Sequence, residues 1–160
     1  MAKRKVFYSF HYDNDVFRVQ QIRNMGVIEG NTPVTPNTWE TLKQSGDKAV
    51  EEWIAENLKN KSCVVVLIGA NTSKRPWVLH EIEQAWNMRK PILGIYIHNL
   101  NCLKTGKCAK GSNPFEKFTM QKDNKKLSDV VKCYDPKSLD AYNDIANNID
   151  TWIEQAIISR

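Results

Sequence analysis

The sequence predicts an α/β domain in which a central, mainly parallel sheet lies between two layers of helices, as in flavodoxin-like folds. Two apolar runs, residues 63–68 and 92–97, have the continuous hydrophobicity of parallel strands that are buried on both faces. Segments with helical periodicity separate the predicted strands, which favours right-handed crossovers and a three-layer arrangement. A chain of 160 residues is long enough for one such domain with a sizeable core. We therefore expect a single domain over residues 1–160, with the two apolar runs at the centre of its sheet.

The first part of the chain predicts a strand, a helix and a long connection. Lys5–Phe10 combines β-branched and aromatic residues, which is typical of a strand. Asp13 or Asn14 is suited to cap the helix that follows, because short polar side chains accept hydrogen bonds from the free amides of a first turn. Residues 25–46 contain three glycines and two prolines, so they predict a long loop, with a vestigial strand near residues 27–28.

The rest of the chain predicts two helices, a long loop, a last strand and a closing helix. Residues 47–60 and 76–89 repeat apolar side chains at intervals of three and four, as helices with one buried face do. Residues 98–129 have no periodicity and contain seven lysines, which indicates a long basic loop. A weak strand over residues 130–134 and a helix over residues 138–159 complete the predicted domain.

Composition and missing motifs exclude several classes of protein. No apolar run approaches the roughly 20 residues of a membrane helix, and the N-terminus lacks the apolar core of a signal peptide, so we expect a cytoplasmic location. The phosphate-binding GxGxxG and GxxxxGK[ST] motifs are absent, as are HExxH and GxSxG. Four cysteines without a CxxC pair argue against a zinc site. The net charge of +5 is mild and indicates no specific partner.

Polar side chains follow three predicted strands at the edge where open α/β sheets bind ligands. They are His11 and Tyr12 after the first strand, Asn71 and Ser73 after the second, and His98 and Asn99 after the third.

In the helix over residues 76–89, Trp77, Glu81 and Gln84 share one flank, beside the same crevice. Ordinary explanations compete with a functional one. Glu81 can serve the helix dipole, His11 can be a surface histidine, and Trp77 can simply pack.

Two stretches resemble sequence boxes of TIR domains. Residues 6–10, Val-Phe-Tyr-Ser-Phe, resemble the first-strand box. Residues 77–81, Trp-Val-Leu-His-Glu, resemble the Trp-Cys-x-x-Glu box that holds the catalytic glutamate of NAD-cleaving TIR enzymes, with Val78 in place of the cysteine. With His11, Tyr12 and Asp15 added, the pattern is similar to that of the TIR-like proteins of the bacterial Thoeris antiphage system.

The resemblance implies cleavage of the nicotinamide–ribose bond of NAD, with NAD as substrate and no cofactor or metal. For a Thoeris-type protein it implies a cyclic ADP-ribose-type product that signals to a partner effector. Capture of the ribose by water would give ADP-ribose instead, and the sequence does not choose between the two products. The oligomeric state, including a homo-oligomer, also stays open. Glu81 would be the catalytic residue. The expected substrate-binding residues lie at the crevice: Phe10, His11, Tyr12, Asn71, Ser73 and Trp77.

Two other functions stay open on the sequence alone. The protein can be a non-catalytic TIR-like module that acts by homotypic assembly. It can also bind nucleic acid through its basic loop, although Phe115 and Phe118 are the only aromatic residues there, which disfavours this function. The loop itself is either a lid whose lysines, at positions 104, 107 and 110, meet the pyrophosphate of NAD, or a solvated insertion, which we favour.

Overall fold

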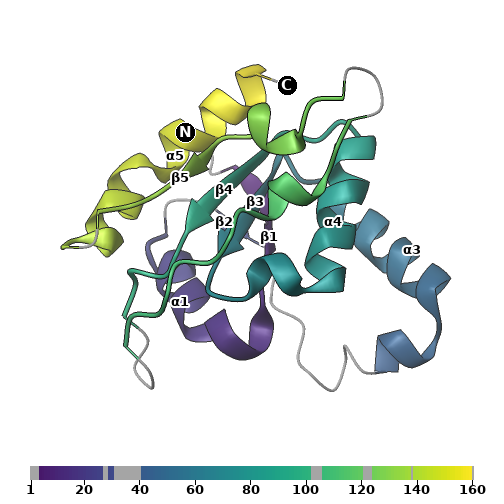
Figure 1. Cartoon of the computed structure of the whole chain (residues 1–160), viewed down its shortest axis with the longest axis horizontal. Helices are drawn as coiled ribbons and strands as arrows, with labels where there is room; N and C mark the ends of the chain where they lie inside the picture. The colour runs from purple at the N-terminus through teal and green to yellow at the C-terminus, as the bar shows by residue number, and fades with distance from the viewer. Residues whose placement is uncertain are drawn as a thin grey trace.

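The computed structural model describes residues 4–26, 29–30, 41–101, 106–120, 124–137 and 139–159. These residues form a five-stranded parallel sheet with the strand order β2-β1-β3-β4-β5 (Figure 1). The strands are β1 (Lys5–Ser9), β2 (Glu29–Gly30), β3 (Cys63–Ile68), β4 (Ile92–Tyr96) and β5 (Cys133–Tyr134). This is the strand order of flavodoxin-like folds, so the predicted fold class is confirmed.

The two apolar runs take interior positions in the sheet. The run at residues 63–68 forms β3, the middle strand, and the run at residues 92–97 forms β4 beside it. All six residues of β3 are buried, because helices cover both of its faces. In the parallel register Ser9 lies opposite Val66, so β1 ends beside the fourth of the six residues of β3.

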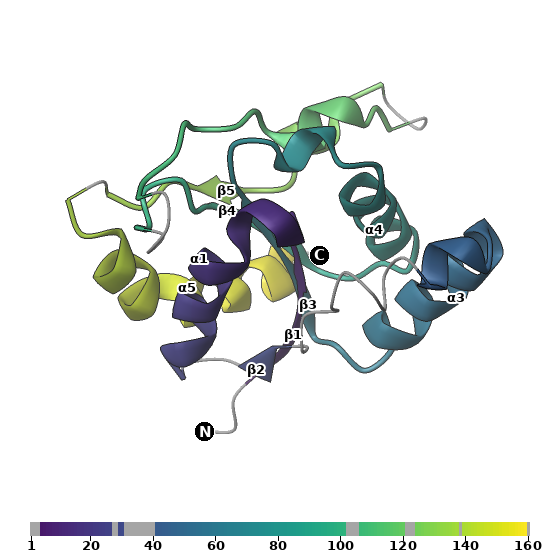
Figure 2. The same cartoon turned by 90° about the horizontal axis from the view of Figure 1, so that it is seen from below.

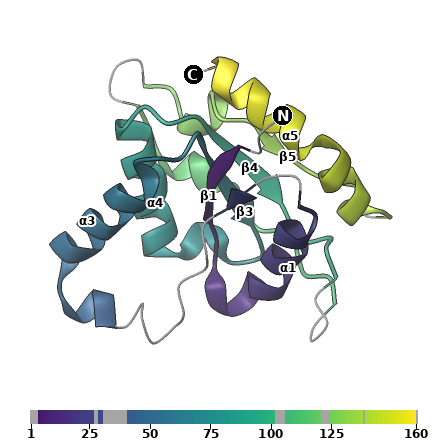
Figure 3. The same ribbon diagram turned by 180° about the vertical axis from the view of Figure 1, so that it is seen from behind.

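Helices cover both faces of the sheet. Figure 2 shows α1 (Tyr12–Asn24) and α5 (Ala141–Ser159) on one side, and α3 (Asp47–Leu58) and α4 (Pro76–Asn87) on the other. The view from behind in Figure 3 shows the same separation. The predicted three-layer arrangement is therefore confirmed. Within the described ranges, no helix has the length and apolarity needed to cross a membrane.

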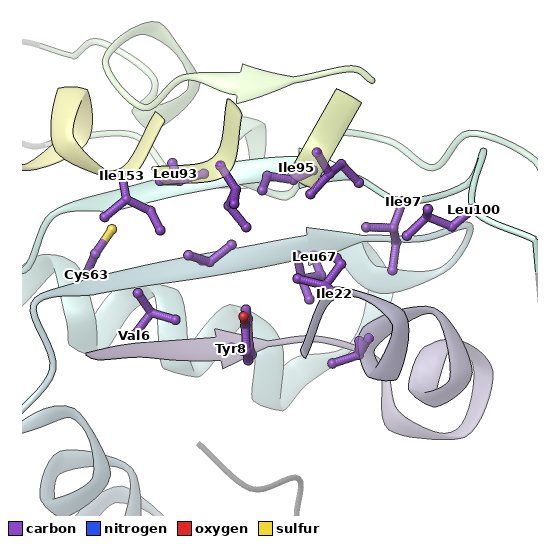
Figure 4. Packing of buried hydrophobic residues seen from close by; sticks show 14 of the residues in the cluster. Val6, Tyr8, Ile22, Cys63, Leu67, Leu93, Ile95, Ile97, Leu100 and Ile153 are labelled. Carbon is purple, nitrogen blue, oxygen red and sulfur yellow. The ribbon is translucent and has the colours of Figure 1, made fainter. Parts of the chain in front are cut away.

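The core is divided in two by the alternation of side chains along the strands. Cys63, Val65 and Leu67 of β3 face α1 and α5, where they meet Ile22 and Ile153 (Figure 4). The alternate residues of β3 face α3 and α4, together with their buried apolar stripes: Val64, Val66, Ile68, Val50, Ile54, Leu58, Val78, Ile82 and Ala85. Burying a Val, Leu or Ile side chain stabilises a fold by roughly 1.5–3 kcal/mol, so both layers hold the sheet.

The start of α1 differs from the sequence prediction. Neither Asp13 nor Asn14 occupies the capping position, because the helix begins at Tyr12 and His11 precedes it. The amide of Asp15 donates to the carbonyl of His11 at 2.9 Å, which closes the first turn two residues earlier than a cap at Asp13 would. The prediction of a capping side chain was therefore wrong.

Two other boundaries differ from the sequence prediction, and a third expectation is not tested. The vestigial strand expected at residues 27–28 falls outside the described residues, and the strand that does pair with β1 is Glu29–Gly30. The last strand is reduced to Cys133–Tyr134. The closing helix begins at Ala141, and the amide of Lys137 donates to the carboxylate of Asp144 at 2.8 Å just before it.

The long basic loop contains local structure that its sequence did not predict. Two 3₁₀ turns, Pro114–Lys117 and Leu127–Asp129, form within it. Phe115 and Leu127 are at most 2% exposed and join the core layer beside α4. Their burial explains how the described part of this loop is held against the domain.

Candidate active site at the carboxyl edge of the sheet

Glu81 lies in the second turn of α4, where the helix packs against the end of β1. Its side chain is only 8% exposed. The hydroxyl of Ser9, at the last position of β1, donates a hydrogen bond of 3.1 Å to Oε1 of Glu81. Ser9 is itself fully buried. Residues 72 positions apart in the sequence therefore form a buried polar contact at the carboxyl edge of the sheet.

The local sequence explains why Glu81 is placed there. Thr72–Lys74 makes a 3₁₀ turn after β3, and Pro76 then occupies the first turn of α4, where a missing amide hydrogen costs nothing. Val78 and Ile82 bury the core stripe of α4. Glu81 precedes Ile82 and is drawn toward the sheet beside that stripe.

Burial raises the pKa of Glu81 to about 8, and the hydrogen bond from Ser9 lowers that pKa only in part. A carboxyl group with a strongly raised pKa at a ligand-binding edge is typical of functional sites. The helix-dipole explanation fits poorly, because Glu81 is the sixth residue of α4 and the dipole acts mainly within the first turn. A surface acid that served the helix would also remain solvated.

Phe10 and His11 follow Ser9 directly and so lie at the carboxyl end of β1. Successive Cα atoms are about 3.8 Å apart, which places the Cα of His11 within about 7.6 Å of the Cα of Ser9. His11 is 8% exposed, and Phe10 is half-buried against the core layer that contains α1. Tyr12 begins α1, but its side chain lies outside the described part of the chain. His11 is therefore no ordinary surface histidine.

Asn71 and Ser73 follow β3 and differ in their surroundings. Asn71 is exposed, whereas Ser73 is 1% exposed. The hydroxyl oxygens of Ser73 and Ser112 are 2.6 Å apart and share a hydrogen bond. Thr72 supports the same turn, because the amide of Gly69 donates to its hydroxyl at 2.8 Å. Ser73 thus has a partner within the protein, and Asn71 is open to a ligand.

The flank of α4 does not act as one surface. Trp77 is half-buried, packs against the core layer beside α3, and meets His80 edge-to-face with 5.4 Å between ring centroids. Gln84 donates to the carbonyl of Glu51 in α3 at 3.0 Å. Gln84 therefore faces α3, and its predicted place at the crevice was wrong, because the helix turns this position toward its neighbour.

Sequence reasoning missed a buried ion pair at the same edge. Nη1 of Arg18 lies 3.0 Å from Oδ1 of Asp15, and the two side chains are 1% and 0% exposed. Arg18 also donates through Nε to the carbonyl of Leu100 at 3.0 Å and through Nη2 to that of Gly106 at 2.7 Å. The i, i+3 spacing of Asp15 and Arg18 was the available signal, but it is shared by many surface pairs.

Residues 106–113, here called the strap, run along the carboxyl ends of β3 and β4. Gly111 lies so close to the carbonyl of Gly69 that a Cβ atom would overlap it. The amide of Cys108 donates to the carbonyl of His98 at 3.0 Å. Lys110 pairs with Asp135 at 2.8 Å, which raises the pKa of that lysine. The strap therefore borders the carboxyl edge of the sheet and is tied to it on several sides.

The flavodoxin-like parallel sheet, with Glu81 at its carboxyl edge, is the arrangement that the TIR-like resemblance of the sequence implies. The family described as "Thoeris protein ThsB, TIR-like domain" matches residues 7–102, which run from β1 through β4 and include Glu81. The chain is also 37% identical over 134 residues to a protein of Bacillus cereus (strain MSX-D12) named "Putative cyclic ADP-D-ribose synthase ThsB1". That match covers 79% of this chain and 69% of the relative. The chain belongs to the Thoeris ThsB TIR-like family, which confirms the resemblance found in the sequence.

Proposed function

We propose that this protein cleaves the nicotinamide–ribose bond of NAD in antiphage defence, with Glu81 as its catalytic residue. The observation that carries the proposal is the buried carboxyl group of Glu81, with its raised pKa, beside Ser9 at the carboxyl edge of the sheet. Membership in the Thoeris family supports a role in defence. The name of the Bacillus cereus relative, a cyclic ADP-D-ribose synthase, supports NAD as the substrate.

One carboxylate is enough for the chemistry. When the bond between ribose C1′ and the nicotinamide nitrogen breaks, the electron pair goes to the nitrogen, and nicotinamide leaves as a neutral molecule. Positive charge then develops on the ribose, and a nearby anion stabilises it, as in glycosidases. The hydroxyl of Ser9 holds Oε1 of Glu81, which leaves Oε2 for the ribose.

The raised pKa of Glu81 has a consequence for this mechanism. At neutral pH the carboxyl group of the free protein is largely protonated, because burial disfavours its anion. The nicotinamide ring of NAD is cationic, and a cation beside a carboxyl group lowers its pKa. We propose that substrate binding lowers the pKa of Glu81, so that its proton is released to solvent and the anion that the transition state needs is formed.

The nucleophile decides the product. Capture of the ribose by an atom of the same NAD molecule gives a cyclic ADP-ribose isomer, and capture by water gives ADP-ribose. The name of the relative favours the cyclic product, which we propose as the signal to a partner effector. Phe10, His11, Tyr12, Asn71, Ser73 and Trp77 remain the proposed binding residues. The proposal for His11 and Asn71 is supported by their positions directly after the carboxyl ends of β1 and β3.

Replacing Glu81 by glutamine tests the proposal. The amide keeps the shape of the side chain but never carries the charge, so NAD turnover should fall by about 10²-fold or more. Turnover is measured by chromatography of nicotinamide and the nucleotide product, with the protein isolated before and after phage infection. Glu83→Gln is the matched control, because Glu83 is exposed two residues along the same helix. Native turnover in the Glu81→Gln variant would remove Glu81 from the catalytic role.

The alternative of a non-catalytic module that assembles with copies of itself has one observation in its favour. Ile158, near the end of α5, is 83% exposed, and Val130 is 48% exposed. Exposed apolar side chains of this kind are common at protein contacts, although scattered ones are also ordinary. Light scattering across a concentration series, with Ile158→Glu for comparison, decides whether assembly occurs and whether it persists without NAD turnover.

A further inference from the structure

Arg18 connects three segments that border the crevice. It stands in α1, which follows β1, and its guanidinium reaches Leu100 and Gly106 in the segment after β4. Its partner Asp15 lies against Gly69, the residue that follows β3, so closely that a Cβ atom at Gly69 would overlap the carboxylate. The carboxyl ends of three neighbouring strands are thus joined through one ion pair.

Arg18 holds a distant segment in place through several hydrogen bonds. An arginine guanidinium is planar and rigid, and it presents donors in several directions at once. Arg18 uses these donors on one carboxylate and two backbone carbonyls, with distances of 3.0, 3.0 and 2.7 Å. The carbonyls lie 82 and 88 positions away in the sequence, so these bonds hold a distant segment against α1 (Figure 3).

A purely structural role would not require a charge at this position. Replacing a buried ion pair by apolar residues of similar size is often neutral or stabilising. Neither Asp15 nor Arg18 belongs to the two apolar core layers. Both bonds of Arg18 to distant residues end on loop carbonyls at the carboxyl edge of the sheet. The pair therefore acts on the part of the molecule that borders the ligand.

The remaining contacts of the strap depend on its position along this edge. Gly111 rests on the carbonyl of Gly69, and Ser112 bonds to Ser73 at 2.6 Å. Ser73 immediately precedes the residues that lead into α4 and Glu81. A shift of Gly106 would thus be passed along the strap to the turn that begins the catalytic helix.

We propose that Arg18, held by Asp15, is a positioning residue that fixes the strap as a preformed wall of the crevice for a dinucleotide. The inference rests on the proposed NAD function. A wall that is ordered before binding removes part of the entropy cost of ordering it around the ligand. Arg18 therefore affects substrate binding, whereas cleavage of the nicotinamide–ribose bond depends on the carboxylate of Glu81.

Arg18→Lys tests the proposal, because lysine keeps the positive charge beside Asp15 but lacks the planar set of donors that also reaches the carbonyls of Leu100 and Gly106. Amide hydrogen exchange should become faster within residues 106–113 of this variant. The KM for NAD should rise about tenfold while kcat stays within about threefold, since preorganisation affects binding first. Arg23→Lys is the control, because Arg23 lies in the last turn of the same helix, and it should change neither measurement.

A second variant separates positioning from loss of fold. Asp15→Asn combined with Arg18→Met removes both charges, and its melting temperature reports whether the domain still folds. Unchanged exchange in the strap of Arg18→Lys would overturn the proposal, and so would faster exchange with unchanged KM. An equal fall in kcat in both Arg18 variants without a rise in KM would also overturn it. Failure of the proposed function looks different: the native protein would then turn over no NAD, whatever the strap does.

Discussion

Two buried carboxyl groups at the same edge of the sheet have opposite surroundings. Asp15 lies 3.0 Å from a buried arginine, and Glu81 receives a hydroxyl hydrogen bond and makes no ion pair within the described residues. Burying an unpaired charge is costly, and a pKa shift toward the neutral form is the usual response. The pairing at Asp15 suits a permanent charge that holds Arg18, the proposed positioning residue, in place. The absence of a paired cation at Glu81 among the described residues suits a group whose charge must appear only when a substrate is present.

The largest expected effect comes from breaking the pair at Arg18. Arg18→Met leaves the carboxylate of Asp15 buried beside an apolar side chain. Removing one partner of a buried ion pair typically costs about 3–5 kcal/mol, so the free energy of unfolding should fall by that amount. Urea denaturation measures it, with Arg23→Met as the control. A loss below about 1 kcal/mol would mean that Asp15 is not held in its charged form by Arg18.

The pH dependence of stability should reveal the opposite behaviour of Glu81. The pKa of Glu81 is about 8 in the folded protein, and its ordinary value of 4.5 applies to the unfolded protein. Between these two pH values the folded state therefore binds a proton that the unfolded state has lost. Stability from this group is complete below pH 4.5 and is lost as the pH rises through 8. The Glu81→Gln variant has no such titrating group. Between pH 5.5 and pH 8.5 its free energy of unfolding should therefore increase, relative to that of the native protein, by up to a few kcal/mol.

Thermal melts of the two proteins at both pH values measure this difference. Glu83→Gln should follow the native protein at each pH, because Glu83 is exposed. Parallel curves for native and Glu81→Gln would show that the pKa of Glu81 is ordinary. The contrast with Asp15 would then disappear.

The pH dependence of activity sharpens the comparison further. If the anion of Glu81 is the active form, kcat/KM for NAD should rise about tenfold per pH unit below the pKa and level off above about 8. The profile of kcat should level off at lower pH, because the cationic nicotinamide lowers the pKa of Glu81 in the complex. Coincident profiles for the two parameters would contradict deprotonation on substrate binding.

The smallest effect is expected at Ser9. Ser9→Ala removes the hydroxyl that stabilises the anion of Glu81, so the pKa of Glu81 should rise further and the kcat/KM profile should move to higher pH. The hydrogen bond contributes about 1–2 kcal/mol to the anion, which corresponds to roughly one pH unit. Ser45→Ala, at an exposed position outside the crevice, serves as the control. An unmoved profile would show that Ser9 does not set the pKa of Glu81.

The sequence predicted the features that a local pattern can encode. The apolar runs that became β3 and β4, the helical stripe of α4 and the TIR-like box around Glu81 all depend on residues close together in the chain. The bonds of Ser9 to Glu81 and of Arg18 to Leu100 and Gly106 were missed because these partners lie between 72 and 88 residues away, and no periodicity reports such contacts. The strap was missed for a related reason. Its fit depends on Gly111 meeting a backbone carbonyl, which no side-chain pattern announces.

Arg18 accepts any residue type at its two distant partners, but other constraints fix both of them. It binds the carbonyl oxygens of Leu100 and Gly106, which every amino acid has. Leu100, however, is 2% exposed within a core layer, and Gly106 has a φ of 69°, which L side chains rarely adopt. Gly69 and Gly111 are restricted in another way, because a Cβ atom at either position would collide with its neighbours. Selection on this edge should therefore be strict at three glycines and one arginine, and looser at exposed strap positions such as Ala109.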